Sequence, residues 1–257
     1  MPTALNTAPA ELWLRRFHST ADGRLRLFCF PHAGGAASYY FPFSQTLAPE
    51  IEVVAVQYPG RQERRREPRI ESIAGLADAV AGALDGQLDR PYAFFGHSMG
   101  AIVAFEVAYR LLAASAPAPL RLFASGRRAP STRREESVHL RDDAGVVAEL
   151  KRLGGTDQRF LEDEEILALA LPPTRSDYKA VETYAFEPRP PLDVPITVLT
   201  GRSDPQTTPQ EIAAWVEHST TPPDFHAFPG GHFFLDGCRD EVAETIRAAV
   251  RTDRRAL

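Results

Sequence analysis

Short runs of apolar residues alternate along the chain with longer stretches in which apolar residues recur every three or four positions. The short runs predict buried strands and lie at residues 25–30, 51–56, 92–95, 120–125, 195–200 and 224–228. The longer stretches predict amphipathic helices over residues 73–88, 101–114, 210–217 and 239–251. Because helices separate the strands, we expect an α/β fold with a mostly parallel central sheet flanked by helices.

One interval is longer than a single crossover helix requires. About 70 residues separate the fourth apolar run from the fifth, and connections of that length carry structure of their own. Periodicity there predicts one helix around residues 146–153, a second over 166–170 that ends at Pro172-Pro173, and a third over 178–184. We interpret residues 135–187 as a helical lid inserted into a single domain spanning residues 1–257. A peripheral helical layer is the alternative.

Composition is that of an ordinary globular protein, with 44% apolar and 25% charged residues in a chain of 257. A net charge of −5 argues against a general nucleic-acid-binding protein, and the chain contains no apolar run long enough to cross a membrane. The segment Met1–Ala10 lacks the features of a signal peptide, so a cytoplasmic location is expected. Cys29 and Cys238 are therefore predicted to be free thiols, with Cys29 in the core.

The third apolar run leads into a pentapeptide that carries chemistry, Gly96-His97-Ser98-Met99-Gly100. A G-x-S-x-G sequence between a strand and a helix is typical of a nucleophile elbow, in which glycines relieve the crowding of a strained turn. The helix N-terminus that follows favours a developing oxyanion. We predict that Ser98 is a catalytic nucleophile rather than a plain turn serine. His97 should point away from the serine side chain and serve packing or hydrogen bonding.

A serine nucleophile needs a general base and an acid that orients it. In this topology the acid and the base follow the serine in that order. Asp204 lies in the turn after the fifth run, and His232 lies in a glycine-bearing loop after the sixth. No acidic residue directly follows the fourth run, which favours Asp204 as the orienting acid. The alternative is that Asp204 belongs to a plain surface turn. No spacing resembles a zinc site, so no metal and no other cofactor is predicted.

The loop Pro31-His32-Ala33-Gly34-Gly35-Ala36 follows the first apolar run. A serine hydrolase needs two backbone N–H donors for the oxyanion, one from the residue after the nucleophile and one from a loop after an early strand. These donors are predicted to be the amides of Met99 and Ala33. The alternative for the loop is a glycine-rich turn without a donor role.

Five ordered motifs, at residues 30–35, 58–64, 96–100, 201–205 and 230–234, resemble the stand-alone type II thioesterases of polyketide and nonribosomal peptide assembly lines. The resemblance extends from about residue 25 to the C-terminal helix. It implies an α/β-hydrolase fold with a helical lid. The implied function is hydrolysis of stalled or wrong acyl groups from the phosphopantetheine arm of an acyl or peptidyl carrier protein. The family's triad maps onto Ser98, Asp204 and His232, and its oxyanion amides onto Ala33 and Met99.

Two other functions remain open on the sequence. A carboxylesterase or lipase of the same fold is disfavoured by the motif at residues 58–64. A catalytically dead binding protein is disfavoured by the intact Ser, Asp and His in order. The motif at residues 58–64 also begins a run of basic residues, interleaved with Glu63 and Glu67. These basic residues would form structural ion pairs or dock an acidic carrier protein. This run comprises Arg61, Arg64, Arg65, Arg66 and Arg69.

Overall fold

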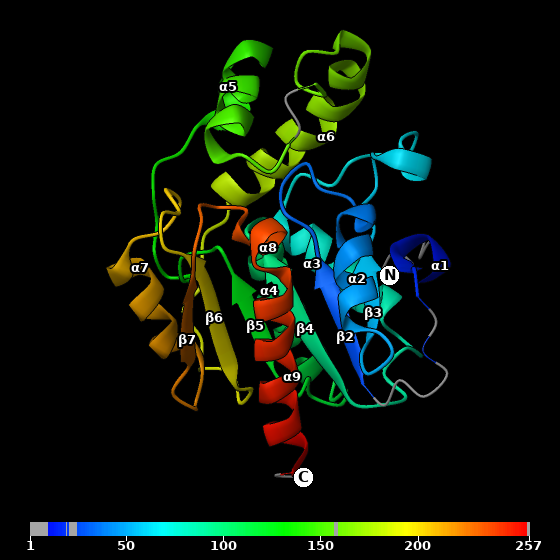
Figure 1. The fold of residues 1–257 in the computed structure, drawn as a ribbon, viewed down its shortest axis with the longest axis vertical. Helices are drawn as coiled ribbons and strands as arrows, with labels where there is room; N and C mark the ends of the chain where they lie inside the picture. The colour runs from blue at the N-terminus through cyan, green and yellow to red at the C-terminus, as the bar shows by residue number, and fades with distance from the viewer. Residues whose placement is uncertain (1–9, 19, 21–24, 157–158, 256–257) are drawn as a thin grey trace, which may run out of the picture.

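The strands expected from the apolar runs form one sheet (Figure 1). In the part of the chain that the computed structural model describes (residues 10–18, 20, 25–156 and 159–255), seven strands follow the order β1-β3-β2-β4-β5-β6-β7. They are β1 Leu14–Arg16, β2 Arg26–Phe30, β3 Glu52–Val56, β4 Tyr92–His97, β5 Leu122–Ser125, β6 Ile196–Gly201 and β7 Asp224–Phe228. β1 pairs antiparallel with β3, and every other neighbouring pair is parallel. The predicted α/β fold is therefore confirmed.

The chain also forms helices, most of which cover the two faces of this sheet. They are α1 Ala10–Trp13, α2 Phe41–Leu47, α3 Ile73–Ala83, α4 Met99–Ala113, α5 Asp143–Leu153, α6 Glu164–Glu182, α7 Pro209–Ala213, α8 Phe234–Gly237 and α9 Arg239–Arg255. Short 3-10 segments lie in the connections: η1 Ala37–Tyr40, η2 Gln62–Arg64, η3 Val138–Leu140 and η4 Ala214–His218. α3 and α4 pack on one face, and α2 and α9 pack on the other. The single helix predicted over residues 210–217 is instead α7 followed by η4.

The packing of β2 shows why its sequence is apolar from Leu27 to Phe30. Leu27 and Cys29 belong to the core on the α2 and α9 side, and Phe28 and Phe30 belong to the core on the α3 and α4 side. Both faces of a central parallel strand are buried, so successive side chains are all apolar. Cys29 is fully buried, and burial raises the pKa of its thiol. Both this cysteine and Cys238 are free, as predicted.

Two helices, α5 and α6, stand above the sheet, beyond the carboxyl ends of its strands (Figure 1). α5 matches the first helix predicted in this interval. The second and third are one helix, because α6 continues through Pro172 and Pro173, and the prediction that a helix ends there is wrong. Each proline removes one backbone donor, which deprives the carbonyls of Ala168 and Leu169 of their usual partner.

Packing of the turns after the prolines explains why the helix continues. Each proline costs the helix a hydrogen bond and brings its ring against the carbonyl one turn earlier. Most side chains that follow are buried, and their packing outweighs that loss. The buried residues are Pro173, Thr174, Ser176, Asp177, Tyr178, Ala180 and Val181.

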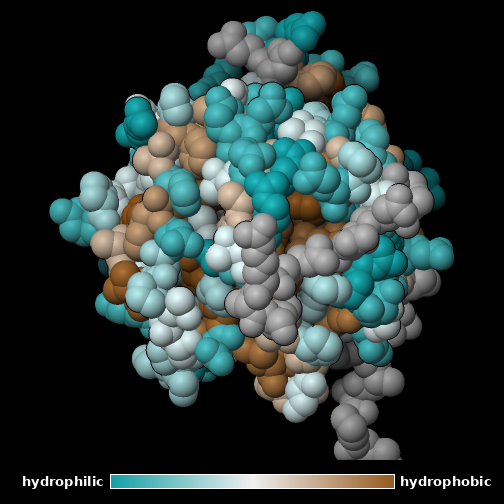
Figure 2. Space-filling model, turned by 60° about the horizontal axis from the view of Figure 1, so that its bottom comes forward, coloured by the Kyte–Doolittle hydropathy of each residue, from teal (hydrophilic) through white to brown (hydrophobic). Residues whose placement is uncertain are grey.

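Figure 2 brings forward the end of the molecule that lies away from α5 and α6. Hydrophilic residues dominate this view, with hydrophobic residues in small areas between them. In contrast, Leu140, Phe160 and Leu169, in and around α5 and α6, are 75%, 52% and 67% exposed. Among the described residues, no helix combines the length and apolarity needed to cross a membrane. The first nine residues, which bear on the signal-peptide prediction, lie outside the described part.

Candidate active site

Ser98 occupies a sharp turn between β4 and α4. It is the N-cap of the helix, with φ 55° and ψ −119°, a backbone conformation that is strained for a residue with a side chain. The flanking glycines are required by close backbone approach. A Cβ on Gly96 would lie 2.2 Å from the carbonyl oxygen of Gly100, and one on Gly100 would lie 2.0 Å from that of Phe30. The pentapeptide therefore has the predicted elbow geometry.

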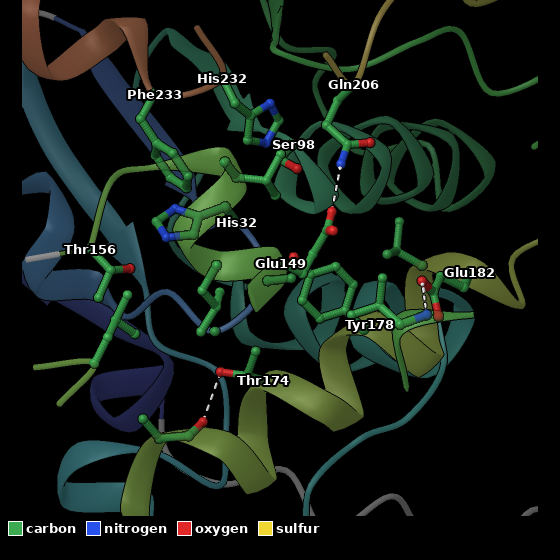
Figure 3. Close-up of a pocket in the computed structure, with 18 of the residues that line it drawn as sticks. His32, Ser98, Glu149, Thr156, Thr174, Tyr178, Glu182, Gln206, His232 and Phe233 are labelled. Carbon is green, nitrogen blue, oxygen red and sulfur yellow. Dashed lines mark hydrogen bonds between the residues drawn. The ribbon is translucent and has the colours of Figure 1, made fainter. Parts of the chain in front are cut away.

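Asp204 and His232 come together from loops after neighbouring strands. His232 Nδ1 lies 3.1 Å and 3.0 Å from the two carboxylate oxygens of Asp204, and both residues are buried. The two loops touch where a Cβ on Gly201 would lie 2.1 Å from the carbonyl oxygen of Gly231. Figure 3 shows the imidazole of His232 beside the side chain of Ser98. The three residues singled out from sequence thus lie at one place.

These residues open onto a pocket of about 210 Å³ beneath α5 and α6 (Figure 3). Its wall on the sheet side includes Ser98, His232 and Phe233. The opposite wall is largely apolar and comes from the residues in and around the two helices. These residues include Val138, Leu150, Leu153, Phe160, Leu161, Ile166, Leu167, Ala170 and Val181. A narrow site with an apolar wall suits an acyl chain held against the serine.

The loop after β2 lies beside the elbow because β2 and β4 are neighbours, with Phe30 paired to Gly96. Ala33 in this loop lines the same pocket as Ser98. Met99 begins α4, so its amide belongs to the unpaired first turn of a helix. Both residues are therefore near the nucleophile, and their role as oxyanion donors stays a prediction.

Two further histidines border the site and are held neutral. His97 Nδ1 hydrogen-bonds Ser125 Oγ at 2.9 Å, in agreement with the predicted packing role. Burial, with the nearby charge of His232, holds the pKa of His97 well below its usual value. The same causes lower the pKa of His32 to about 3. At neutral pH these two neighbours therefore add no charge to the site.

Buried histidines should make folding stability fall on mild acidification. Burial lowers the pKa of His32 to about 3 and that of His218 to about 4. Ser131 N–H donates to His218 Nε2 at 3.4 Å, which requires the neutral ring. Below pH about 6.5 these histidines bind protons in the unfolded chain but not in the folded chain. The free energy of unfolding therefore decreases as the pH falls. We expect the Tm to decrease between pH 7 and pH 5; a constant Tm would contradict buried, neutral histidines.

Much of the basic run forms ion pairs and hydrogen bonds within the protein, which is the first of the two alternatives for it. Arg61 and Arg64 are 6% and 2% exposed, and they pair with Asp177 and Glu67 respectively. Arg69 Nε donates to Ser176 Oγ on α6 at 3.0 Å. Arg65, Arg66 and Arg69 are exposed, so a docked partner would contact these three.

Sequence reasoning missed two polar links to α5 and α6. Gln206 Nε2 donates to Glu149 Oε1 on α5 at 3.3 Å, while its backbone N–H donates to Asp204 Oδ1 at 2.8 Å. Asp177 on α6 binds Arg61 and the loop after β2. The sequence motifs included Asp204 of the first link and Arg61 of the second, and no local pattern pointed to Gln206, Glu149 or Asp177. Among the described residues, no cluster of three or more histidine, cysteine and carboxylate side chains could hold a metal ion.

Comparisons with known proteins agree with this arrangement. The "Probable cadicidin biosynthesis thioesterase" of Streptomyces griseus is 51% identical over 247 residues, covering 96% of this chain and 68% of the relative. "Thioesterase PikA5" of Streptomyces venezuelae is 48% identical over 240 residues, covering 91% and 84%.

Among solved structures, the type II thioesterase BorB from the borrelidin biosynthetic cluster superposes with a TM-score of 0.87. It is 44% identical to this chain, with 95% of this chain and 99% of BorB covered. The expected α/β-hydrolase fold, a mostly parallel sheet between helices, is shared with these thioesterases. The model of the thioesterase domain matches residues 25–250. The chain therefore belongs to the thioesterase family.

Proposed function

We propose that this thioesterase hydrolyses acyl groups from the phosphopantetheine arm of carrier proteins and so clears stalled or wrong chains from a polyketide or nonribosomal peptide assembly line. The single observation that supports it most is Ser98, on its strained turn, in an acyl-sized pocket beside the Asp204–His232 pair. Similarity along nearly the full length to BorB, a type II thioesterase, supports the class of substrate.

The geometry supports a double-displacement mechanism. Ser98 Oγ attacks the thioester carbonyl and gives its proton to His232 Nε2, while Asp204 holds the opposite ring nitrogen. The amides of Met99 and Ala33 donate hydrogen bonds to the negatively charged tetrahedral oxygen and stabilise it. Collapse breaks the C–S bond, and His232 protonates the leaving pantetheine thiolate. Water then attacks the acyl-serine with His232 as the base, which releases the carboxylic acid and restores Ser98.

The segment at about residues 135–187 is proposed as the lid of this single domain. Its α5 and α6 supply the apolar wall of the pocket, and they lie apart from the layers that cover the sheet (Figure 1). A covering segment that buries little surface against the sheet opens more readily than the sheet unfolds. The acyl chain would then enter along this wall, with the pantetheine arm following it from the pocket mouth.

Substitutions in the wall should change acyl preference without abolishing hydrolysis. Leu150→Ala and Leu167→Ala enlarge the pocket beside α5 and α6, so kcat/KM for long acyl groups should change several-fold relative to an acetyl group. Kinetics on an acyl-carrier series measures this ratio. Leu169→Ala is the matched control, because Leu169 lies on the same helix and is 67% exposed.

The lid proposal has a second readout in hydrogen exchange. Amides of α5 should exchange faster than those of β3, because the helix packs on little of the core. Equal protection of α5 and β3, together with substitutions that alter only stability, would make the segment a peripheral helical layer instead.

A panel of acyl groups on acyl and peptidyl carrier proteins, scored for acid released, tests the proposed function. Matched oxyesters distinguish the carboxylesterase alternative, which predicts equal or faster turnover of the oxyesters. Labelling of Ser98 by a serine-reactive phosphonate tests the dead-protein alternative, which predicts no labelling. Charge reversal at Arg65 and Arg66, which are exposed, measures whether they dock the carrier protein through changes in KM.

A further inference from the structure

One buried carboxylate of α6 reaches the loop that carries Ala33. Asp177, 1% exposed, accepts hydrogen bonds from Arg61 Nη1 at 2.7 Å and Nη2 at 2.9 Å. It also accepts one from the backbone N–H of Gly34 at 2.8 Å. Arg61 Nη1 donates further to the carbonyl oxygen of Gly35 at 2.8 Å. The ion pair therefore holds one backbone donor and one backbone acceptor of the same short loop.

The loop is a tight turn pressed against the helix. Gly35 N–H donates to the carbonyl oxygen of His32 at 3.0 Å, which closes a turn with Ala33 as its second residue. Gly34 has φ 77°, and a Cβ on it would lie 2.5 Å from Oγ1 of Thr174, one turn of α6 before Asp177. The direction of the Ala33 N–H is set by the orientation of this turn, because that amide lies within it.

A contribution to folding stability does not by itself explain why this buried ion pair is present. Removing two charges from water costs about as much as their attraction returns, so a buried ion pair is often replaceable by apolar side chains without loss. What apolar side chains would not reproduce is the directed hydrogen bonding to Gly34 and Gly35. An oxyanion donor contributes only when it points at the position that the developing charge will occupy.

We propose that Asp177 and Arg61 are positioning residues for the oxyanion site: they orient the turn so that the amide of Ala33 faces the carbonyl under attack. The inference rests on the proposed function. It gives the C-terminal half of α6 a task in addition to its share of the apolar wall. It also connects the motif at residues 58–64 to catalysis through the loop after β2 rather than through a carrier protein.

Asp177→Asn keeps the size of the side chain and removes its charge and one acceptor. Loss of a single oxyanion donor costs about 100- to 1,000-fold in kcat, so a misdirected donor should cost about 10- to 100-fold. KM should stay within about twofold, since the interaction is made in the transition state. The pH profile of kcat/KM should keep its shape, because His232 and Asp204 are untouched. Arg61→Lys, which keeps the charge, should recover part of the loss caused by Arg61→Gln.

Asp177→Asn leaves the buried Arg61 unpaired and is liable to unfold. The double variant Arg61→Gln/Asp177→Asn removes both charges, and it should show the same loss in kcat as a single folded variant, since the two residues act as one unit. Glu71→Gln is the matched control. It removes the exposed ion pair between Glu71 and Lys179 of α6 and should leave kcat unchanged.

The rate at which a phosphonate labels Ser98 separates this inference from the proposed function. The phosphonyl oxygen uses the same oxyanion donors, so labelling of Asp177→Asn or the double variant should slow by about the same factor as thioester turnover. If the phosphonate labels the wild-type enzyme but the enzyme releases no carboxylic acid from any carrier protein, the proposed function fails. The comparison of labelling rates between wild type and variants still decides the inference about Asp177 and Arg61. Unchanged kcat and labelling rate in folded variants, or a loss confined to KM or Tm, would overturn it.

Discussion

Ser98→Ala should lower kcat for thioester hydrolysis by at least about 1,000-fold, because loss of a triad nucleophile removes the covalent route. The elbow backbone should remain, since its geometry is set by Gly96 and Gly100 rather than by the hydroxyl. We therefore expect the Tm to stay within a few degrees of wild type. Steady-state release of acid from an acyl-carrier substrate and a thermal melt measure the two effects.

A matched control for this variant is Ser203→Ala, in the loop beside Asp204. Ser203 is exposed, and no part of the proposed chemistry uses its hydroxyl. It should retain wild-type turnover. Activity of Ser98→Ala within about tenfold of wild type would show that another group attacks the carbonyl, and the assignment of the nucleophile would fall.

Asp204→Asn should lower kcat by about 10,000-fold, the loss seen when the acid of a serine triad becomes an amide. The carboxylate lies 3.0 Å from Nδ1 of His232 and accepts from the backbone N–H of Gln206. An amide nitrogen turned toward the imidazole favours the wrong tautomer, so Nε2 no longer accepts the serine proton. Presteady-state formation of the acyl-enzyme measures the step directly.

Asp193→Asn controls for the loss of a carboxylate near the same strand. Asp193 precedes β6 and is exposed, where it accepts a hydrogen bond from Thr220. Wild-type turnover is expected. Full activity in Asp204→Asn would place the orienting acid elsewhere.

The elements that carry the candidate site were predictable from sequence because each sits directly after an apolar strand. In a parallel sheet the carboxyl ends of the strands share one edge, so chain order alone brings Ser98, Asp204 and His232 together. The glycines of the elbow could be interpreted in advance for the same reason, since a turn this tight requires them.

Other features depend on contacts that leave no local pattern. β1 is a three-residue edge strand whose Leu-Arg-Arg sequence has no apolar run, so it forms through its pairing with β3. The continuity of α6 through two prolines is decided by burial of its later turns. Asp177 and Arg61 lie 116 positions apart, and neither position indicates the other in a single sequence.

Residues on both sides of the two prolines in α6 line the acyl pocket, Leu167 and Ala170 before them and Tyr178 and Val181 after them. The contacts of Thr174 and Asp177 with the loop of Ala33 come from the part after the prolines. The carbonyls that the prolines leave unpaired make this the weakest place in the hydrogen-bond ladder of the helix. Substitutions ahead of Pro172 can therefore change chain-length selectivity while leaving the bonds of Asp177 to the loop of Ala33 in place, which makes this portion of the helix a suitable target for engineering substrate range.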